Sequence, residues 1–319
     1  MRSWIKSLNA KQQAVLALII ANIIWGAASP IFKWSLTNIP LFSLAYFRFF
    51  IPSILVLPLV RKQNLGVSRS LWPPLIALSL LGITANITFF FVGLKFAPSI
   101  NAPIIASSGP IFLILGSVLF LHERPKSKTI LGTLISLVGV LIIVGRPLLE
   151  KGFDLNAFWG NISFIFATFG AVGATLIIKR TVTYLNPLVL TFWSFLIGAM
   201  SFFPFFAWET LKHSWYLQLD IRGMGGLFFG IIFSTTLAYA LDGWALSQIE
   251  ASEAGLFTYI DPVIAALIAI PLLGEVITPL FILGSFFVFA GIFVAENRLH
   301  YHPFHKLRAQ ITPATSIDK

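Results

Sequence analysis

Ten long apolar runs, separated by gaps of a few residues, constrain the fold of this chain more than any other feature. Each run approaches the ~20 residues that an α-helix needs to cross the hydrocarbon core of a bilayer. The strands of a membrane barrel would instead alternate in polarity over about 10 residues, so the runs predict helices. The predicted spans are 14–34, 41–60, 73–94, 98–121, 129–145, 157–178, 187–208, 224–246, 252–273 and 279–296.

The composition supports a lipid environment. Of the 319 residues, 57% are hydrophobic and only 11% are charged, which is too few to coat a soluble core of this size. The net charge of +10 does not indicate nucleic acid, because the basic residues lie in short gaps between spans rather than along one stripe. The chain contains no cysteine, so disulfides and thiolate metal sites are excluded.

The distribution of Lys and Arg predicts the orientation. With the N-terminus in the cytoplasm and ten crossings, fifteen basic residues fall on the cytoplasmic side and five on the opposite side. Cytoplasmic loops carry this kind of excess in membrane proteins. We therefore expect both termini in the cytoplasm, in a multi-pass protein of a bacterial inner membrane.

The chain repeats itself. Residues 84–145 align with 236–297 without a gap at an offset of 152 residues, with 11 identities in 62 positions. The matches include Pro110 with Pro262 and Glu123 with Glu275, residues that lipid exposure alone does not favour. Five spans used twice enter the membrane in opposite senses, which predicts an inverted repeat of the kind found in carriers. Two unrelated helix sets with chance matches are the alternative.

An ordered set of short motifs accompanies the repeat in both halves. The first half has Trp25-Gly26-Ala27-Ala28-Ser29-Pro30, Lys33, Arg48, Gly109-Pro110 and Glu123, and the second has Asp261-Pro262, Gly274-Glu275, Gly284 and Gly291. In these motifs the chain resembles the EamA-type ten-helix members of the drug/metabolite transporter superfamily. The resemblance implies a central cavity lined by spans one to four and six to nine, and the carriage of small polar metabolites.

The expected organisation follows from the repeat. We predict an all-α integral membrane protein of ten transmembrane helices in two inverted repeats, 14–145 and 157–296, followed by a basic cytoplasmic tail, 297–319. Three histidines in the tail lack an accompanying carboxylate or thiolate set, so we expect no metal site. No Gly-rich phosphate loop is present, so we expect neither a cofactor nor direct use of ATP.

Among the ionisable residues within predicted spans, where charge is costly and usually faces a cavity or a partner, we single out four candidates: Lys33, Arg48, Asp242 and Asp261. Arg48 could hold an anionic solute or tie helices together. Asp261 could line the cavity or pair with Arg48 or Lys33. Asp242 could bind a proton or cation, or be structural, and Lys33 could snorkel to the interface.

Matching interruptions in spans four and nine point to the solute site. Gly109-Pro110 and Asp261-Pro262 are repeat mates, and proline disfavours helical geometry just before it. Paired breaks in matching helices are a sequence signal of a transport site. Further candidate lining residues are polar or aromatic and lie deep in spans: Trp25, Asn86, Phe90, Trp193, Tyr239 and Tyr259. Each of these could instead serve helix packing.

Two other repeated features suggest architecture. Glu123 and Glu275 end spans four and nine, where we expect each to cap the helix that follows. Glycines recur seven residues apart in spans five and ten, at 132 and 139 and at 284 and 291, a spacing that suits close helix packing. They could serve an interface within the chain or in a homodimer.

The sequence therefore predicts a secondary transporter, an exporter of small metabolites such as amino acids that works by alternating access. The expected partners are a small-molecule substrate and the lipid bilayer, with proton coupling through Asp242 or Asp261 left open. A membrane-embedded enzyme or a scaffold that transports nothing are the alternatives, but histidine partners for acid–base chemistry are missing from the spans.

Overall fold

The computed structural model describes residues 10–61, 63, 65–109, 111–112, 127–149, 154–181, 186–248 and 257–295. Over these residues the chain is helical, without a strand. The α-helices are α2 (Ala10–Ser35), α3 (Leu41–Val60), α4 (Trp72–Ser79), α5 (Asn86–Phe96), α6 (Asn101–Ala106), α8 (Ser127–Leu149), α9 (Leu155–Thr181), α10 (Pro187–Lys212), α11 (Ile221–Phe228), α12 (Ala238–Leu246), α14 (Ile260–Leu273) and α15 (Pro279–Ala295). The 3-10 turns are η1 (Arg69–Leu71), η4 (Trp215–Gln218) and η6 (Phe257–Tyr259), and the π-helical segments are η2 (Leu80–Ala85) and η5 (Phe229–Leu237).

The helices correspond to the predicted spans. Seven described stretches are long and apolar enough to cross a bilayer, and two shorter apolar helices occupy spans nine and ten. α4, η2 and α5 form one continuous crossing, as do α11, η5 and α12. Span four is described as α6 with residues 107–109 and 111–112. Glu123, Pro110 and the tail 297–319 lie outside the described residues.

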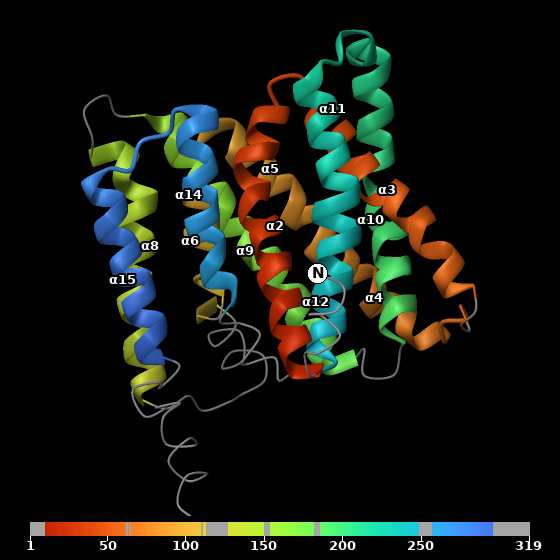
Figure 1. Ribbon diagram of the computed structural model, residues 1–319, viewed down its shortest axis with the longest axis horizontal. Helices are drawn as coiled ribbons and strands as arrows, with labels where there is room; N and C mark the ends of the chain where they lie inside the picture. The colour runs from red at the N-terminus through yellow and green to blue at the C-terminus, as the bar shows by residue number, and fades with distance from the viewer. Residues whose placement is uncertain are drawn as a thin grey trace, which may run out of the picture.

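α8 and α15 stand together at one side of the bundle (Figure 1). Glycines make this contact close: a Cβ added at Gly139 would lie 2.5 Å from the carbonyl oxygen of Gly284, and one at Gly291 would lie 2.5 Å from that of Gly132. The hydroxyl of Ser136 donates to the carbonyl of Val288 at 2.8 Å. The repeated glycines therefore serve a contact within the chain, and a homodimer stays a prediction that they no longer motivate.

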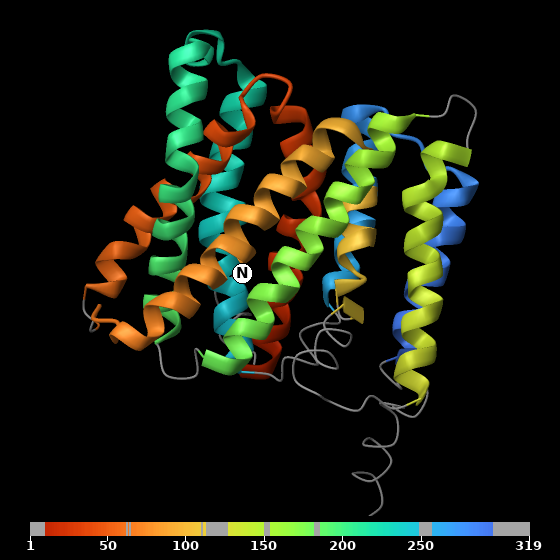
Figure 2. The ribbon, with the colours of Figure 1, turned by 180° about the vertical axis from the view of Figure 1, so that it is seen from behind.

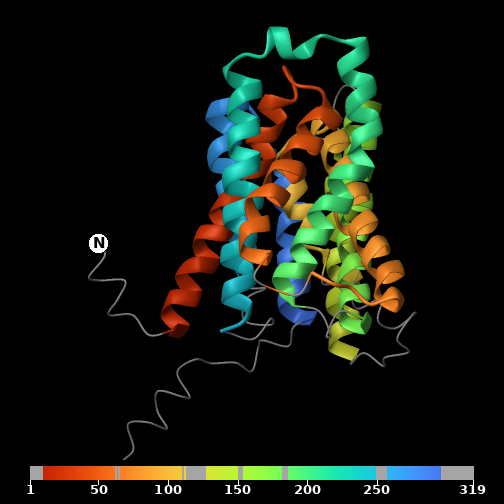
Figure 3. The same ribbon diagram turned by 90° about the vertical axis from the view of Figure 1, so that its right-hand side faces the viewer.

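The remaining helices form the body of the bundle. Seen from behind, α5 and α9 run diagonally side by side (Figure 2), and α3 packs along α10. Phe32, Phe49, Phe91 and Phe202 are fully buried between these helices. Figure 3 shows the crossover through η4 that joins α10 to α11. We call the end of the bundle that carries this crossover the outer end, because the Lys and Arg distribution predicts it outside the cytoplasm.

The two π-helical segments occupy matching places in the repeats. η2 ends at Ala85 and η5 ends at Leu237, residues that the 152-residue offset aligns. In η5 the hydroxyl of Thr236 donates to the carbonyl of Ile231 at 2.7 Å, five residues back. The apolar pattern of these spans did not predict the change of helix type. π-Helical turns inside α-helices occur frequently at functional sites. Asn86 directly follows η2, and Ser234 and Thr235 lie within η5.

Candidate functional site

A cavity of about 400 Å³ lies between the two halves of the chain. Its wall comes from α2, α5, α6 and α9, together with the first turn of α14. The lining residues are Trp25, Ser29, Asn86, Phe90, Ala102, Pro103, Ala106, Gly109, Phe164, Ala167, Thr168, Ala171, Val172, Thr175 and Asp261. Five of the predicted candidates therefore meet at one cavity: Trp25, Asn86, Phe90, Gly109 and Asp261.

The cavity lies at a break in helix four and at the described start of helix nine. α6 ends at Ala106, and Ser107 and Ser108 form a turn before Gly109. The two serine hydroxyls donate back to the carbonyls of Pro103 and Ile105, at 2.8 and 2.5 Å, an arrangement by which serine competes with the helix ladder.

In span nine the 3-10 turn η6 precedes α14, which begins at Ile260. Asp261 and Pro262 lie in the first turn of α14, where a missing proline N–H removes no helical hydrogen bond. The repeat mates Gly109 and Asp261 thus lie directly after the break in span four and after the 3-10 turn of span nine, and both line the cavity. Pro262 is buried and does not line it.

Gly26 positions Asp261. A Cβ added at Gly26 would lie 2.8 Å from the carbonyl oxygen of Asp261 and 2.9 Å from its Cα, so only glycine allows this approach of α14 to α2. The close contact places the carboxylate beside Trp25 and Ser29 in the cavity wall. The sequence marks Gly26 as part of a repeated motif, and its packing role follows only from tertiary contacts.

Some polar atoms of the cavity wall have hydrogen-bond partners within the protein, and others have none among the described residues. Oδ1 of Asp261 and the hydroxyl of Ser29 are buried without a hydrogen-bond partner in the described part of the chain. Asn86 donates through Nδ2 to the carbonyl of Ala167 at 2.8 Å. Thr168 and Thr175 donate to the carbonyls one turn earlier on α9, at 2.9 and 3.0 Å.

Sequence reasoning missed the contribution of α9. Phe164, Thr168, Ala171 and Thr175 all line the cavity, and their spacing of four, three and four residues places them on one helix face. Two threonines seven residues apart in span six were a signal that could have indicated this face. Ser29, one turn after Trp25 on α2, was a similar signal.

Arg48 lies outside the cavity in a site of its own. Its Nε and NH2 donate to the hydroxyls of Thr235 and Ser234, at 3.1 and 3.0 Å, on the π-helical segment η5. The guanidinium carbon lies 4.6 Å from the ring centroid of Phe32, and the rings of Phe49 and Phe91 are within 6 Å. The arrangement matches the helix-tying interpretation, with hydroxyls and rings in place of the expected carbonyls or carboxylate.

Lys33 joins the two halves at the outer end. Its Nζ lies 3.1 Å from Oε1 of Glu275 and donates to the carbonyl of Ala97 at 2.6 Å. Glu275 also accepts from the backbone N–H groups of Ser99 and Ile100, at 2.6 and 3.1 Å. The expected capping of the following helix by Glu275 is therefore wrong. The carboxylate caps the start of α6 in the other half, because inverted packing brings that helix N-terminus beside the end of α14.

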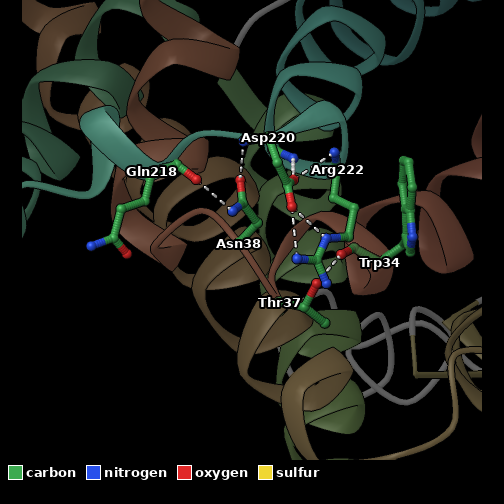
Figure 4. Close-up of polar contacts among 7 residues, drawn as sticks. Trp34, Thr37, Asn38, Gln218, Asp220 and Arg222 are labelled. Carbon is green, nitrogen blue, oxygen red and sulfur yellow. Dashed lines mark hydrogen bonds and ion pairs between the residues drawn. The ribbon is translucent and has the colours of Figure 1, made fainter.

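A second contact between the halves lies at the same end (Figure 4). The Asn38 side chain donates to the carbonyl of Gln218 and accepts from the N–H of Asp220, both at 3.0 Å. Asp220 caps α11 and binds the Arg222 guanidinium at 2.7 Å. The Arg222 guanidinium holds the pKa of the Asp220 carboxyl below its ordinary value. We call the contacts of Lys33 and Asn38 together the outer latch.

The other predicted site residues do not line the cavity. Trp193 donates to the carbonyl of Leu65 at 3.2 Å and packs edge-on against Trp72. Tyr239 packs edge-on against Trp25, with ring centroids 5.5 Å apart. Tyr259 packs against Phe289, and Asp242 lies half-buried on α12. Their assignment to a binding site stays a prediction.

A helical bundle with apolar crossings and a cavity of solute size between its two halves is the architecture of a membrane transporter. A family model described as EamA-like transporter family matches residues 12–145 and 158–296. The chain belongs to the EamA-like transporter family. The predicted fold, ten transmembrane helices as two inverted repeats, is confirmed with it.

Several proteins similar to this chain are named as transporters. An "Uncharacterized transporter" of Archaeoglobus fulgidus is 28% identical over 90% of this chain and 99% of its own length. The "Uncharacterized transporter YoaV" of Bacillus subtilis is 26% identical over 88% and 96%. The "Pseudopaline exporter CntI" of Pseudomonas aeruginosa is 27% identical over 56% and 62%. A solved structure, described only as "Crystal structure of protein", shares the fold, with a TM-score of 0.61 and 19% identity over 90% of this chain and 98% of that one.

Proposed function

We propose that the chain is a secondary carrier, which binds small organic solutes in the cavity and moves them across the membrane by alternating access. One observation carries the proposal: a cavity of about 400 Å³ is lined from both repeats, and the repeat mates Gly109 and Asp261 both contribute to its wall. Its volume is within the range of small-molecule sites, and its mostly apolar wall with few polar groups is typical of them.

The outer latch supports alternating access. Lys33, on α2 of the first repeat, reaches Glu275 in the second. Asn38 reaches Gln218 and Asp220 in the same way. Contacts of this kind can break as a unit when one half rocks against the other, which would open the cavity toward the outer end.

The proposal also specifies the membrane in which the carrier works and the direction of transport. The excess of Lys and Arg in alternate loops supports a cytoplasmic location for both termini, and we propose that the protein works in the inner membrane of a bacterium. At 27% identity one relative is named an exporter, which supports transport out of the cytoplasm. The solutes we expect are amino acids and related metabolites, because the cavity combines a carboxylate and amide with aromatic walls.

Counterflow in proteoliposomes tests the function. Purified protein is reconstituted with one unlabelled solute inside, and uptake of the same labelled solute is measured over a panel of amino acids, amines, organic acids and sugars. We expect saturable uptake of at least one solute. If folded protein accelerates the exchange of none of them, the carrier function is excluded for the solutes of that panel.

A further inference from the structure

The cavity offers hydrogen-bond acceptors rather than donors. The hydrogens of Thr168 and Thr175 are engaged by backbone carbonyls, which leaves oxygen lone pairs toward a solute. Asn86 has its amide N–H bonded to Ala167, and its Oδ1 remains as an acceptor. Asp261 adds a carboxylate oxygen without a partner in the described residues. Among the described residues of this lining, the hydroxyl of Ser29 is buried and has no hydrogen-bond partner.

The charge of the lining is unbalanced. Asp261 is the one ionisable residue among those that line the cavity in the described part of the chain. Neither Arg48 nor Lys33 lines the cavity. Arg48 donates to the hydroxyls of Ser234 and Thr235, with its NH1 left without a partner in the described residues, and Lys33 pairs with Glu275. A buried carboxylate without a partner is unfavourable, since its hydration is lost and no opposite charge replaces it.

Aromatic rings surround the same space. Trp25, Phe90 and Phe164 contribute to the wall. Ring faces attract cations, and the attraction grows when both partners are desolvated. Trp25 is held in place, because its Nε1 donates to the carbonyl of Ser234 at 3.1 Å. The rings also provide an apolar wall for the body of a solute.

We propose that the cavity selects solutes with one ammonium group on an apolar or aromatic body, with Asp261 as the counter-charge. An ammonium brings three N–H donors and no acceptor, which complements a lining of carboxylate, amide and hydroxyl oxygens. Asp261, Asn86 and Thr168 bind the ammonium, and Trp25, Phe90 and Phe164 pack on the body. This inference rests on the proposed function and narrows its solutes to amines and to amino-acid derivatives without a free carboxylate, since the described lining holds no cation to pair with one.

Binding of a charge-matched series tests the selection. The probes are phenethylammonium, its neutral N-acetyl derivative and the anion phenylpropionate, which share an aromatic body. Binding to the wild-type protein in lipid nanodiscs is measured by equilibrium dialysis, and Na⁺ alone is tested by its effect on the unfolding temperature. We expect the cation to bind at least about tenfold more tightly than either analogue.

Two aspartate variants localise the effect. Asp261→Asn keeps the shape and removes the charge, so we expect it to bind the cation no better than the neutral analogue. Asp220→Asn is the matched control, because Asp220 is at the outer end and Asn is an equally good helix cap. We expect it to retain the cation preference.

Four outcomes would overturn the ammonium proposal: equal binding of the three probes, preference for the anion, binding of Na⁺ without phenethylammonium, or no binding of any probe. The wild-type series decides the question even if Asp261→Asn does not fold. Failure of the carrier function is recognised separately. Counterflow of a neutral or anionic solute that a bulky residue in the cavity abolishes would sustain the carrier while excluding ammonium selection.

Discussion

Arg48 and Asp261 are two charges inside one bundle, and their surroundings differ. Arg48 is buried between three phenylalanine rings, and two hydroxyls accept from it. Oδ1 of Asp261 is buried without a partner in the described residues, and the residue lines a cavity. Nε and NH2 of Arg48 are satisfied within the bundle, although NH1 is buried without a partner in the described residues, and the residue lies outside the cavity. Asp261 differs because it lies in the wall of a cavity, where a ligand can complete its hydrogen bonds.

The largest effect is expected from filling the cavity. Ala106 is exposed and lines the cavity. Ala106→Trp should reduce counterflow by at least about tenfold, because an indole occupies much of a solute-sized space. Leu141→Trp is the control, since Leu141 is exposed on the peripheral helix α8. Equal transport by both variants would show that solutes do not pass through this cavity.

The second-largest effect is on the free energy of unfolding, which should distinguish Arg48 from Asp261. Arg48→Ala should lower the free energy of unfolding by about 2–4 kcal/mol, since ring contacts and two charged hydrogen bonds are lost. Asp261→Asn should leave it unchanged or raise it, because an unpaired buried carboxylate is unfavourable. Thermal unfolding of the purified protein in detergent measures both. If Asp261→Asn is as destabilised as Arg48→Ala, Asp261 has a structural role.

A smaller effect is expected at the outer latch. Glu275→Gln removes the ion pair with Lys33 and keeps an oxygen for the N-terminus of α6. The latch should weaken by about 1 kcal/mol, roughly a fivefold rise in the outward-open population. The chain has no cysteine, so Ala102→Cys in the cavity wall is a unique reporter. Unchanged labelling of this cysteine by an impermeant maleimide would exclude a gating role.

The smallest effect concerns Asp220. Its pKa in the folded protein lies below the ordinary value of about 4 because Arg222 donates to its carboxylate. The stabilisation is complete above the unfolded pKa and is lost as pH falls through the folded pKa. Asp220→Asn should therefore lose slightly less thermal stability than the wild type between neutral and strongly acidic pH. Identical profiles would mean that the exposed pair contributes nothing measurable.

Arg48 and Asp261 also show which properties of a buried charge can be predicted from the sequence. Both residues are recognisable from the sequence as costly charges within spans, and two interpretations stay open for each. Neither can be resolved from the chain alone, because the hydroxyls that hold Arg48 come from residues 186 and 187 positions away. Repeat alignment did bring Gly109 and Asp261 together, and both line the cavity.

The π-helical segments and the face of α9 explain most of what was not predicted. A π-helical turn depends on one extra residue per turn, which an apolar run without polar markers does not reveal. Asn86 directly follows η2, and Ser234 and Thr235 lie within η5, so the extra residue determines which way these side chains point. Simple helical spacing groups Ser234 and Thr235 with Asp242 instead.

The sequence by itself determined that this protein lies in a lipid bilayer, that it is helical and that it contains an inverted repeat. Those properties depend on local composition, on the length of each apolar run and on similarity between the two halves. Only the tertiary structure decided which buried groups have partners: Arg48 with hydroxyls and rings, Lys33 with Glu275, and Asp261 with none in the described chain. Hydrogen bonds and ion pairs act over a few ångströms, and residues far apart in sequence reach that distance only when the helices pack.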